Sequence, residues 1–293
     1  MKLTNVINKV LDIVASSYFL FTWKRIYVSF AIPRFKRDNH NWGDDVNFVI
    51  VEKLSGKKVI PYKFSLFKKT NYLVIGSVIQ WYSNSRSIIW GAGFLYETNN
   101  IKKPKKVLAV RGPLTRQCLL NNGINCPEIY GDPALLFPRI YQPAIKNKFD
   151  LGIIQHYSEN RSIQLPLHIS SDRIKYINIA NYGRWEDFID RIVSCKAVIS
   201  SSLHGLIVSE AYEIPNIWTV FTDSEISADK KFKYIDFYMS VNKNINSPFV
   251  YNSIVANKNL VQFVQDNWQK PEINLDILIN SCPFKFKDIL LKS

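Results

Sequence analysis

Short apolar runs are the sequence feature that most constrains the fold of this chain. They alternate along the sequence with patterns typical of helices. The runs include residues 71–77, 87–94, 106–113, 150–157, 173–180, 197–202 and 215–221. Because strands that alternate with helices pair in parallel through crossover connections, the sequence predicts an α/β fold with parallel sheets.

A polar stretch with one proline, residues 142–150, separates the first three runs from the rest. We therefore predict two doubly wound domains that face a cleft, over residues 1–141 and 142–262. We expect residues 263–293 to form a helical tail that packs back on the N-terminal domain, with a helix near residues 285–291.

The N-terminal stretch carries apolar side chains at helical spacing between Leu3 and Val14. This pattern predicts either a helix that faces the core or an interfacial helix that rests on acidic lipid. The uncharged run of residues 13–23 is too short to span a bilayer, and Asp12 does not suit the apolar region of a signal peptide.

The net charge of +14 indicates an anionic partner, which could be nucleic acid, an acidic membrane face or a phosphorylated small molecule. Nucleic acid is the least favoured of these, because zinc-finger spacing and a basic recognition helix are missing. The cysteines and histidines show no metal-ligand spacing, so we expect no metal site. Unpaired cysteines are typical of a cytosolic protein.

The stretch SSSLHG, residues 200–205, places a histidine where a strand turns into a helix. If Ser201 or Ser202 caps the helix, His204 lies in its first turn, where backbone N–H groups favour a bound anion. Gly205 would let a ligand approach the backbone. The helix end lowers the pKa of His204 and a bound dianion raises it, so we expect full protonation only with ligand present. The alternative is a histidine that only packs against the strand end.

Other polar residues also follow predicted strands. Arg111 can grip a carboxylate or phosphate, or form a salt bridge with a loop. Asp132 can cap a turn or accept a hydrogen bond from a sugar hydroxyl. Asn41 and Asp44 can cap a helix or likewise accept a hydrogen bond from a sugar hydroxyl. His156 can contact an acceptor or a donor substrate. Another residue, Glu210, lies roughly 240° around the helix from His204, and we expect it to point outward.

The chain resembles the polysaccharide pyruvyl transferase family. The resemblance rests on eight stretches in the order found in that family, which are NWGDDVN, LVIGSVIQW, IIWGAGF, VRGPLT, YGDPALLFP, LGIIQHY, SSSLHGLIVSEAY and KFKYIDFY. It implies two Rossmann-like domains in a GT-B-like pair, with the acceptor on the N-terminal side and the donor on the C-terminal side. It also implies transfer of the pyruvyl group of phosphoenolpyruvate onto two hydroxyls of a surface-polysaccharide sugar, often on a lipid-linked precursor, as a ketal.

The resemblance places the family's catalytic histidine on His204 and its donor-binding arginine on Arg111. The flanking residues Ser201, Ser202, Leu203 and Gly205 would then lie at the donor. Many members carry an arginine directly before the Leu-His pair, whereas this chain has Ser202. If that arginine binds the donor in those members, another cation must replace it here, and Lys231 and Lys233 are the candidates.

We therefore predict a cytoplasmic pyruvyl transferase, peripheral to the inner face of the cell membrane, with phosphoenolpyruvate as donor substrate and no further cofactor. The acceptor ligands predicted for it are Asn41, Asp44, Asp132 and His156. Two alternatives remain, a glycosyltransferase that uses a nucleotide-sugar donor and a non-catalytic module that binds the membrane surface.

Overall fold

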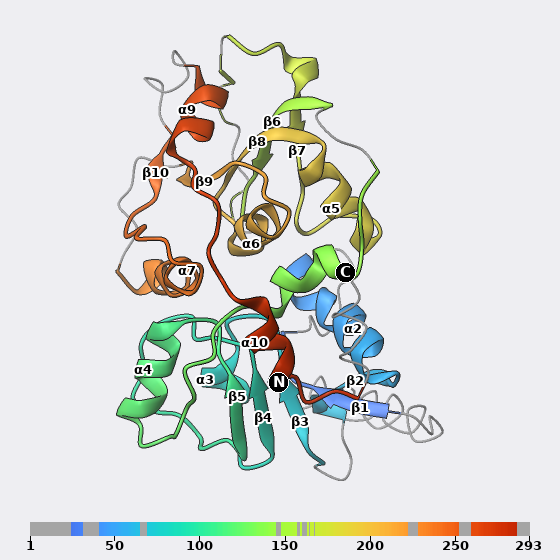
Figure 1. The fold of residues 1–293 in the computed structure, drawn as a ribbon, viewed down its shortest axis with the longest axis vertical. Helices are drawn as coiled ribbons and strands as arrows, with labels where there is room; N and C mark the ends of the chain where they lie inside the picture. The colour runs from blue at the N-terminus through green and yellow to red at the C-terminus, as the bar shows by residue number, and fades with distance from the viewer. Residues whose placement is uncertain are drawn as a thin grey trace, which may run out of the picture.

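The structure of the chain is a computed structural model. It describes residues 25–31, 41–64, 69–144, 148–156, 159, 163, 165–166, 168–221, 228–251 and 259–285. Two sheets lie one above the other, with α2, α6 and α7 between them (Figure 1). The helix expected between Leu3 and Val14 lies outside the described residues, as does all but the first residue of the one expected near 285–291.

The N-terminal sheet has five parallel strands in the order β2-β1-β3-β4-β5. Its strands and helices are β1 (Arg25–Val28), α2 (Trp42–Ser55), β2 (Lys58–Pro61), β3 (Asn71–Leu73), α3 (Ile79–Tyr82), β4 (Ser87–Trp90), β5 (Lys106–Ala109) and α4 (Pro113–Asn121). The parallel pairing and the strands expected within residues 71–77, 87–94 and 106–113 are confirmed. The sequence analysis missed β1 and β2.

The C-terminal sheet also has five parallel strands, in the order β10-β9-β8-β6-β7. Its elements are β6 (Phe149–Ile154), β7 (Ile174–Tyr176), α5 (Trp185–Val193), β8 (Cys195–Ser200), α6 (Leu203–Ala211), β9 (Asn216–Val220), α7 (Ala228–Ser240), β10 (Phe249–Val250) and α9 (Leu260–Asn267). Alternating strands and helices thus build two parallel α/β layers, as the sequence predicts.

The segment after α9 returns to the N-terminal sheet and contains α10 (Leu275–Asn280). The indole Nε1 of Trp90 donates to the carbonyl of Leu278 at 3.1 Å. The ring of Phe284 meets Trp90 edge to face, with ring centres 5.7 Å apart. The exact division into domains at residues 141 and 262 stays a prediction.

One apolar cluster runs through both halves of the molecule and holds the N-terminus of α2 against the C-terminal half. Trp42 is fully buried, its ring stacks on Phe188 with centres 4.9 Å apart, and its Nε1 donates to the carbonyl of Trp185 at 3.0 Å. Because a buried tryptophan removes a large apolar area from water, this contact fixes where α2 begins relative to the second sheet.

In the described part of the chain, every helix is too short or too polar to cross a lipid bilayer.

Candidate active site

His204 lies in the first turn of α6, immediately after β8. Ser202 occupies the N-cap position, although its side chain makes no capping hydrogen bond. The histidine is 8% exposed. Burial lowers its pKa to about 3, and the positive charges of Lys233, Arg111 and His156 add to this effect. The site without ligand therefore holds His204 as a neutral imidazole.

The N-terminus of α2 meets this histidine through Gly43. A Cβ atom built on Gly43 would overlap the imidazole ring on its Nδ1 edge. Glycine is therefore the residue that leaves room for the ring. As a result, the N-termini of two helices from opposite halves of the chain converge on one imidazole, and helix N-termini favour negative ligands.

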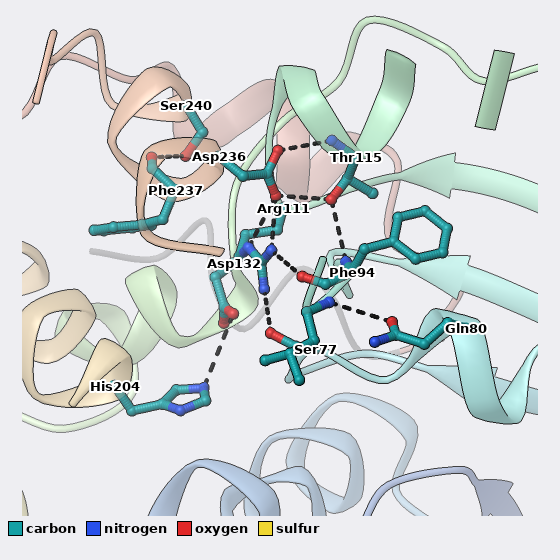
Figure 2. Close-up of polar contacts among 11 residues, drawn as sticks. Ser77, Gln80, Phe94, Arg111, Thr115, Asp132, His204, Asp236, Phe237 and Ser240 are labelled. Atoms are coloured by element: carbon teal, nitrogen blue, oxygen red, sulfur yellow. Dashed lines mark hydrogen bonds and ion pairs between the residues drawn. The ribbon is translucent and has the colours of Figure 1, made fainter. Parts of the chain in front are cut away.

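Asp132 faces the other edge of the same ring (Figure 2). The aspartate is fully buried, and its Oδ1 accepts from the backbone N–H of Ala134 at 2.9 Å. Its Oδ2 lies 4.0 Å from His204 Nε2. Within the described residues, neither of these two atoms has a hydrogen-bond partner. Burial raises the pKa of Asp132 to about 7, although the Ala134 N–H bond and the charge of Arg111 oppose the rise.

Arg111 is fully buried and joins the two halves of the molecule. Its guanidinium Nε and Nη2 both lie 2.9 Å from Asp236 Oδ2 on α7. The same guanidinium donates to Ser77 Oγ and to the carbonyl of Phe94, each at 2.6 Å (Figure 2). Asp236 also accepts from the backbone N–H of Thr115 at 2.8 Å, and so caps α4 from another helix.

The salt-bridge alternative for Arg111 is therefore present in the structure. Direct donor binding by this residue stays a prediction, and it requires the guanidinium to exchange one of its present partners. Its positive charge nevertheless acts on the site, because it helps to lower the pKa values of His204 and Lys233.

Lys233 on α7 is the lysine whose charge reaches the site. Burial lowers its pKa to about 8, and Arg111 adds to this, while Asp44 and Glu159 oppose it. The charge of Lys233 in turn lowers the pKa values of His204 and His156. The other candidate, Lys231, lies roughly 200° away around the same helix.

Asp44 lies in the first turn of α2, beside Gly43. Burial raises its pKa to about 7, and repulsion from Asp45 adds to the rise. A hydrogen bond with Asn41 and the charge of Lys233 oppose it. A carboxyl group with this pKa can accept a proton near neutral pH, which is a property of general bases.

Ser201, just before α6, forms hydrogen bonds with the loop after β6 and with α7. Its Oγ donates to Glu159 and accepts from the backbone N–H of His156 at 2.8 Å. Its carbonyl accepts from the hydroxyl of Tyr234 at 2.6 Å. Burial lowers the pKa of His156 to about 4, with Lys233 adding to the effect.

The structure thus brings many of the predicted site residues to one place between the sheets. They are Asp44, Arg111, Asp132, His156, Ser201, Lys233 and His204. The buried residues Ser202 and Leu203 belong to the same turn of α6 as the histidine. Their assignment to donor or acceptor stays a prediction.

Three expectations from the sequence need correction. The cap of α2 is Asn41, whose side chain accepts from Gly43 N–H at 3.1 Å, and Asp44 lies inside the helix instead of capping it. A Cβ on Gly205 would overlap Ser200 Oγ, so this glycine permits close packing of α6 on β8 and not the approach of a ligand. Glu210 is fully buried, and its Oε1 lies 2.6 Å from Lys243 Nζ.

Four residues of the site have no role among the sequence-based predictions: Gly43, Glu159, Asp236 and Tyr234. Gly43 carries a detectable signal, since a glycine in the first turn of a helix is unfavourable unless something packs against it. The partners of Asp236 and Tyr234 lie more than thirty residues away in the chain, so no local pattern reveals them.

No group of three or more His, Cys, Asp and Glu side chains is placed to hold a metal ion among the residues that the structure describes.

Fold and site together define a parallel α/β protein with a cationic, acid–base centre between its two sheets. The profile of the polysaccharide pyruvyl transferase family matches residues 10–220, well over half of the chain. The chain belongs to the polysaccharide pyruvyl transferase family, and this membership makes it a transferase.

Two curated relatives are similar to this chain over most of its length. An uncharacterized protein of Acanthamoeba polyphaga mimivirus is 30% identical over 226 residues, which cover 74% of this chain and 75% of that protein. The succinoglycan biosynthesis protein ExoV of Rhizobium meliloti (strain 1021) is 24% identical over 214 residues, which cover 70% of this chain and 63% of ExoV. This chain thus matches less than two thirds of ExoV.

A solved structure of an uncharacterized protein from Klebsiella pneumoniae subsp. pneumoniae NTUH-K2044 covers 86% of this chain and 99% of its own. The sequence identity is 16% and the TM-score is 0.41, a likeness too distant to place any residue.

Proposed function

We propose that the protein transfers the pyruvyl group of phosphoenolpyruvate onto two hydroxyls of a saccharide, forms a ketal and releases phosphate. The observation that carries this proposal is a set of neighbouring basic groups, Arg111, Lys233 and His204, in which the positive charge of one disfavours protonation of the others when no ligand is bound. Lys233 and His204 each have a pKa lowered by burial and by neighbouring positive charge. A ligand with about three negative charges would offset this effect, and phosphoenolpyruvate has a carboxylate and a phosphate.

The reaction needs groups that move protons. The enol carbon of the donor gains one proton, and the two attacking hydroxyls lose two. One of these protons ends on the carbon and the other leaves with the phosphate. His204 at the α6 N-terminus is placed to donate the proton that the enol carbon gains and to accept a proton from an attacking hydroxyl. Lys233 and the helix N-terminus hold the leaving phosphate.

Asp44 is the residue we assign to the acceptor hydroxyl. Its raised pKa suits a group that accepts a hydroxyl proton near neutral pH. Its charge also reaches Tyr82, whose pKa is raised by burial first and by Asp44 second. Asp44 therefore interacts electrostatically with Tyr82 of α3, and we assign both to the acceptor side.

A cavity of about 250 Å³ beside α3 supports a saccharide acceptor. Trp81, which is 55% exposed, and Tyr82 line it together with Ser83, Asn84 and Lys102. Aromatic faces pack against the apolar faces of sugar rings, while hydroxyl, amide and ammonium groups bind sugar oxygens. Among the residues that the structure describes, the lining carries no acidic side chain that would repel an anionic or lipid-linked saccharide.

The proposal retains the finer expectations from the sequence. The two sheets would enclose the substrates in a GT-B-like cleft, and the acceptor would be a precursor of a surface polysaccharide. Work on a lipid-linked precursor would place the protein at the inner face of the cell membrane.

A thermal-shift titration tests the donor. We expect phosphoenolpyruvate to raise the melting temperature in a concentration-dependent way. Stabilisation by nucleotide sugars instead would favour a glycosyltransferase, and stabilisation by neither would favour a membrane-surface module. Incubation with phosphoenolpyruvate and a panel of glycolipids should then give a product whose mass has grown by one pyruvate less one water.

A further inference from the structure

Two buried polar atoms face each other without a partner at the centre of the site. They are Asp132 Oδ2 and His204 Nε2, 4.0 Å apart, on side chains that are 1% and 10% exposed (Figure 2). A gap of this length is too wide for a hydrogen bond. Leaving buried polar atoms unpaired is unfavourable, so native proteins keep such atoms rarely and often at functional sites.

The ring orientation separates the two imidazole nitrogens. Nε2 points toward Asp132, whereas the Nδ1 edge lies against Gly43 at the N-terminus of α2. One nitrogen therefore faces a buried carboxyl group, and the other faces the point where two helix N-termini converge. An acid–base histidine needs this division, with one nitrogen held by the protein and the other directed to the substrate.

We propose that Asp132 is the positioning partner of His204: it holds the ring through Nε2 and shares one proton with it, while Nδ1 exchanges protons with the substrates. This inference rests on the proposed function for the identity of the substrates, but the pairing itself does not. It also replaces acceptor binding as the role of Asp132, since a fully buried carboxyl group does not reach a sugar in this arrangement.

The proton starts on the carboxyl group. Burial raises the pKa of Asp132 to about 7 and lowers that of His204 to about 3, so below about pH 7 the pair without ligand holds its proton on Asp132. The charged and titratable groups around the ring come from the loops after β5 and β6, from α2 and from α7. Arg111, His156 and Lys233 act on the ring itself, where His156 is neutral at pH 7 because its pKa is about 4, and Asp44 acts on Lys233.

Binding of the anionic donor offsets the positive groups and favours the imidazolium form. The proton then passes from Asp132 Oδ2 to His204 Nε2, and the Nδ1 proton passes to the enol carbon. Nδ1 next takes the proton of an attacking hydroxyl, and Nε2 returns its proton to Asp132 when the product leaves. Asp44 accepts the second hydroxyl proton and passes it to the departing phosphate, so the exchange balances over one turnover.

The pair can be tested without any reaction by following the imidazole nitrogens of ¹⁵N-histidine-labelled protein by NMR. His204→Ala identifies the signal of His204. In the unliganded wild type we expect the His204 nitrogen shifts to change with a midpoint near pH 7, because the neighbouring carboxyl group titrates there. Asp132→Asn, which keeps an oxygen for Ala134 N–H, should remove this step. An identical titration in both proteins would overturn the pairing.

Kinetics tests the same pair in turnover by a double-mutant cycle of Asp132→Asn and His204→Ala. We expect Asp132→Asn to lower kcat/KM at least about tenfold at pH 7 and to move the alkaline decline to lower pH. In the His204→Ala background it should have almost no further effect. Glu210→Gln is the control, because it alters a buried carboxylate on the same helix without facing the ring. Full additivity with an unchanged pH profile would show that Asp132 is merely structural.

The two experiments separate the inference from the proposed function. If phosphoenolpyruvate is not the donor, the kinetic cycle has no signal to follow, but the NMR titration still decides whether the pair exists. If the titration step is absent and turnover is present, the inference fails while the proposed function stands.

Discussion

Two buried acid–base pairs lie side by side in this protein, and they differ in how completely they are satisfied. Arg111 and Asp236 approach to 2.9 Å, and both carry further hydrogen bonds to neighbouring groups. Asp132 and His204 remain 4.0 Å apart, and each keeps an atom without a partner among the described residues. Both pairs are removed from water, so solvent exposure does not explain the difference.

The difference indicates that the Arg111–Asp236 pair is a structural connection and that the Asp132–His204 pair is a reactive centre. The closed pair connects the loop after β5 with α7 and so holds Lys233 in place between the halves of the molecule. The open pair, Asp132 and His204, leaves a proton that can move between the two side chains. It also leaves two buried polar atoms without hydrogen-bond partners, which is unfavourable for stability. A protein that needed both pairs only for stability would be expected to close both.

The largest expected effect comes from breaking the closed pair. Asp236→Ala leaves the Arg111 charge buried without its partner and should lower the free energy of unfolding by about 3–5 kcal/mol. Glu128→Ala removes the partner of Arg116 at an exposed ion pair and should change it by less than about 1 kcal/mol. Urea denaturation measures both changes in the free energy of unfolding. A loss for Asp236→Ala as small as that of the control would contradict a structural role for the Arg111–Asp236 pair.

The open pair should matter for activity more than for stability. His204→Ala should lower kcat/KM at least about a hundredfold, or about 2.7 kcal/mol, while the protein stays folded. His168→Ala is a matched control, because His168 accepts a hydrogen bond from the backbone N–H of Leu260 at 3.0 Å and we assign it no role in the site. Near-normal turnover by His204→Ala would remove this residue from the mechanism.

Gly43→Ala tests whether the contact between α2 and the ring is needed. The added methyl group overlaps the imidazole, so the ring must move, at a cost of about 1–3 kcal/mol. We expect kcat to fall more than the affinity for phosphoenolpyruvate, because the anion-binding backbone stays in place. Steady-state kinetics distinguishes the two, and a wild-type kcat would show that the ring tolerates displacement.

The smallest effect is an uptake of protons on donor binding. The pKa of Lys233 is about 8 in the unliganded site, so at pH 8 about half of these lysines are neutral. An arriving anion raises this pKa, and binding should take up as much as about half a proton at pH 8. Calorimetry in buffers of different ionisation enthalpy measures this uptake. Proton release would contradict the cationic site.

The sequence predicts the ends of strands well and their distant partners poorly. Parallel α/β folds place the carboxyl ends of neighbouring strands along one edge, so Arg111 and His204 could be chosen as site residues from local patterns alone. The pairing of Arg111 with Asp236 could not, since 125 positions separate them in the chain. Only the packing of α7 across the two halves brings them together.

Glu210 shows why periodicity misleads in this fold. Its angle around α6 places it away from His204, and in an amphipathic helix that face would meet water. The first eight residues of α6 are all buried, however, so the helix has no exposed face there. Lys243 and the indole N–H of Trp268 satisfy the carboxylate instead, and both belong to later segments of the chain.

The most direct test of the account is a crystal structure of the protein with phosphoenolpyruvate bound. We expect the phosphate at the N-terminus of α6 beside Lys233, with the enol carbon within reach of His204 Nδ1 and the gap between Asp132 and His204 closed to hydrogen-bond length. A donor bound elsewhere, or with its reactive carbon directed away from His204, would contradict the account.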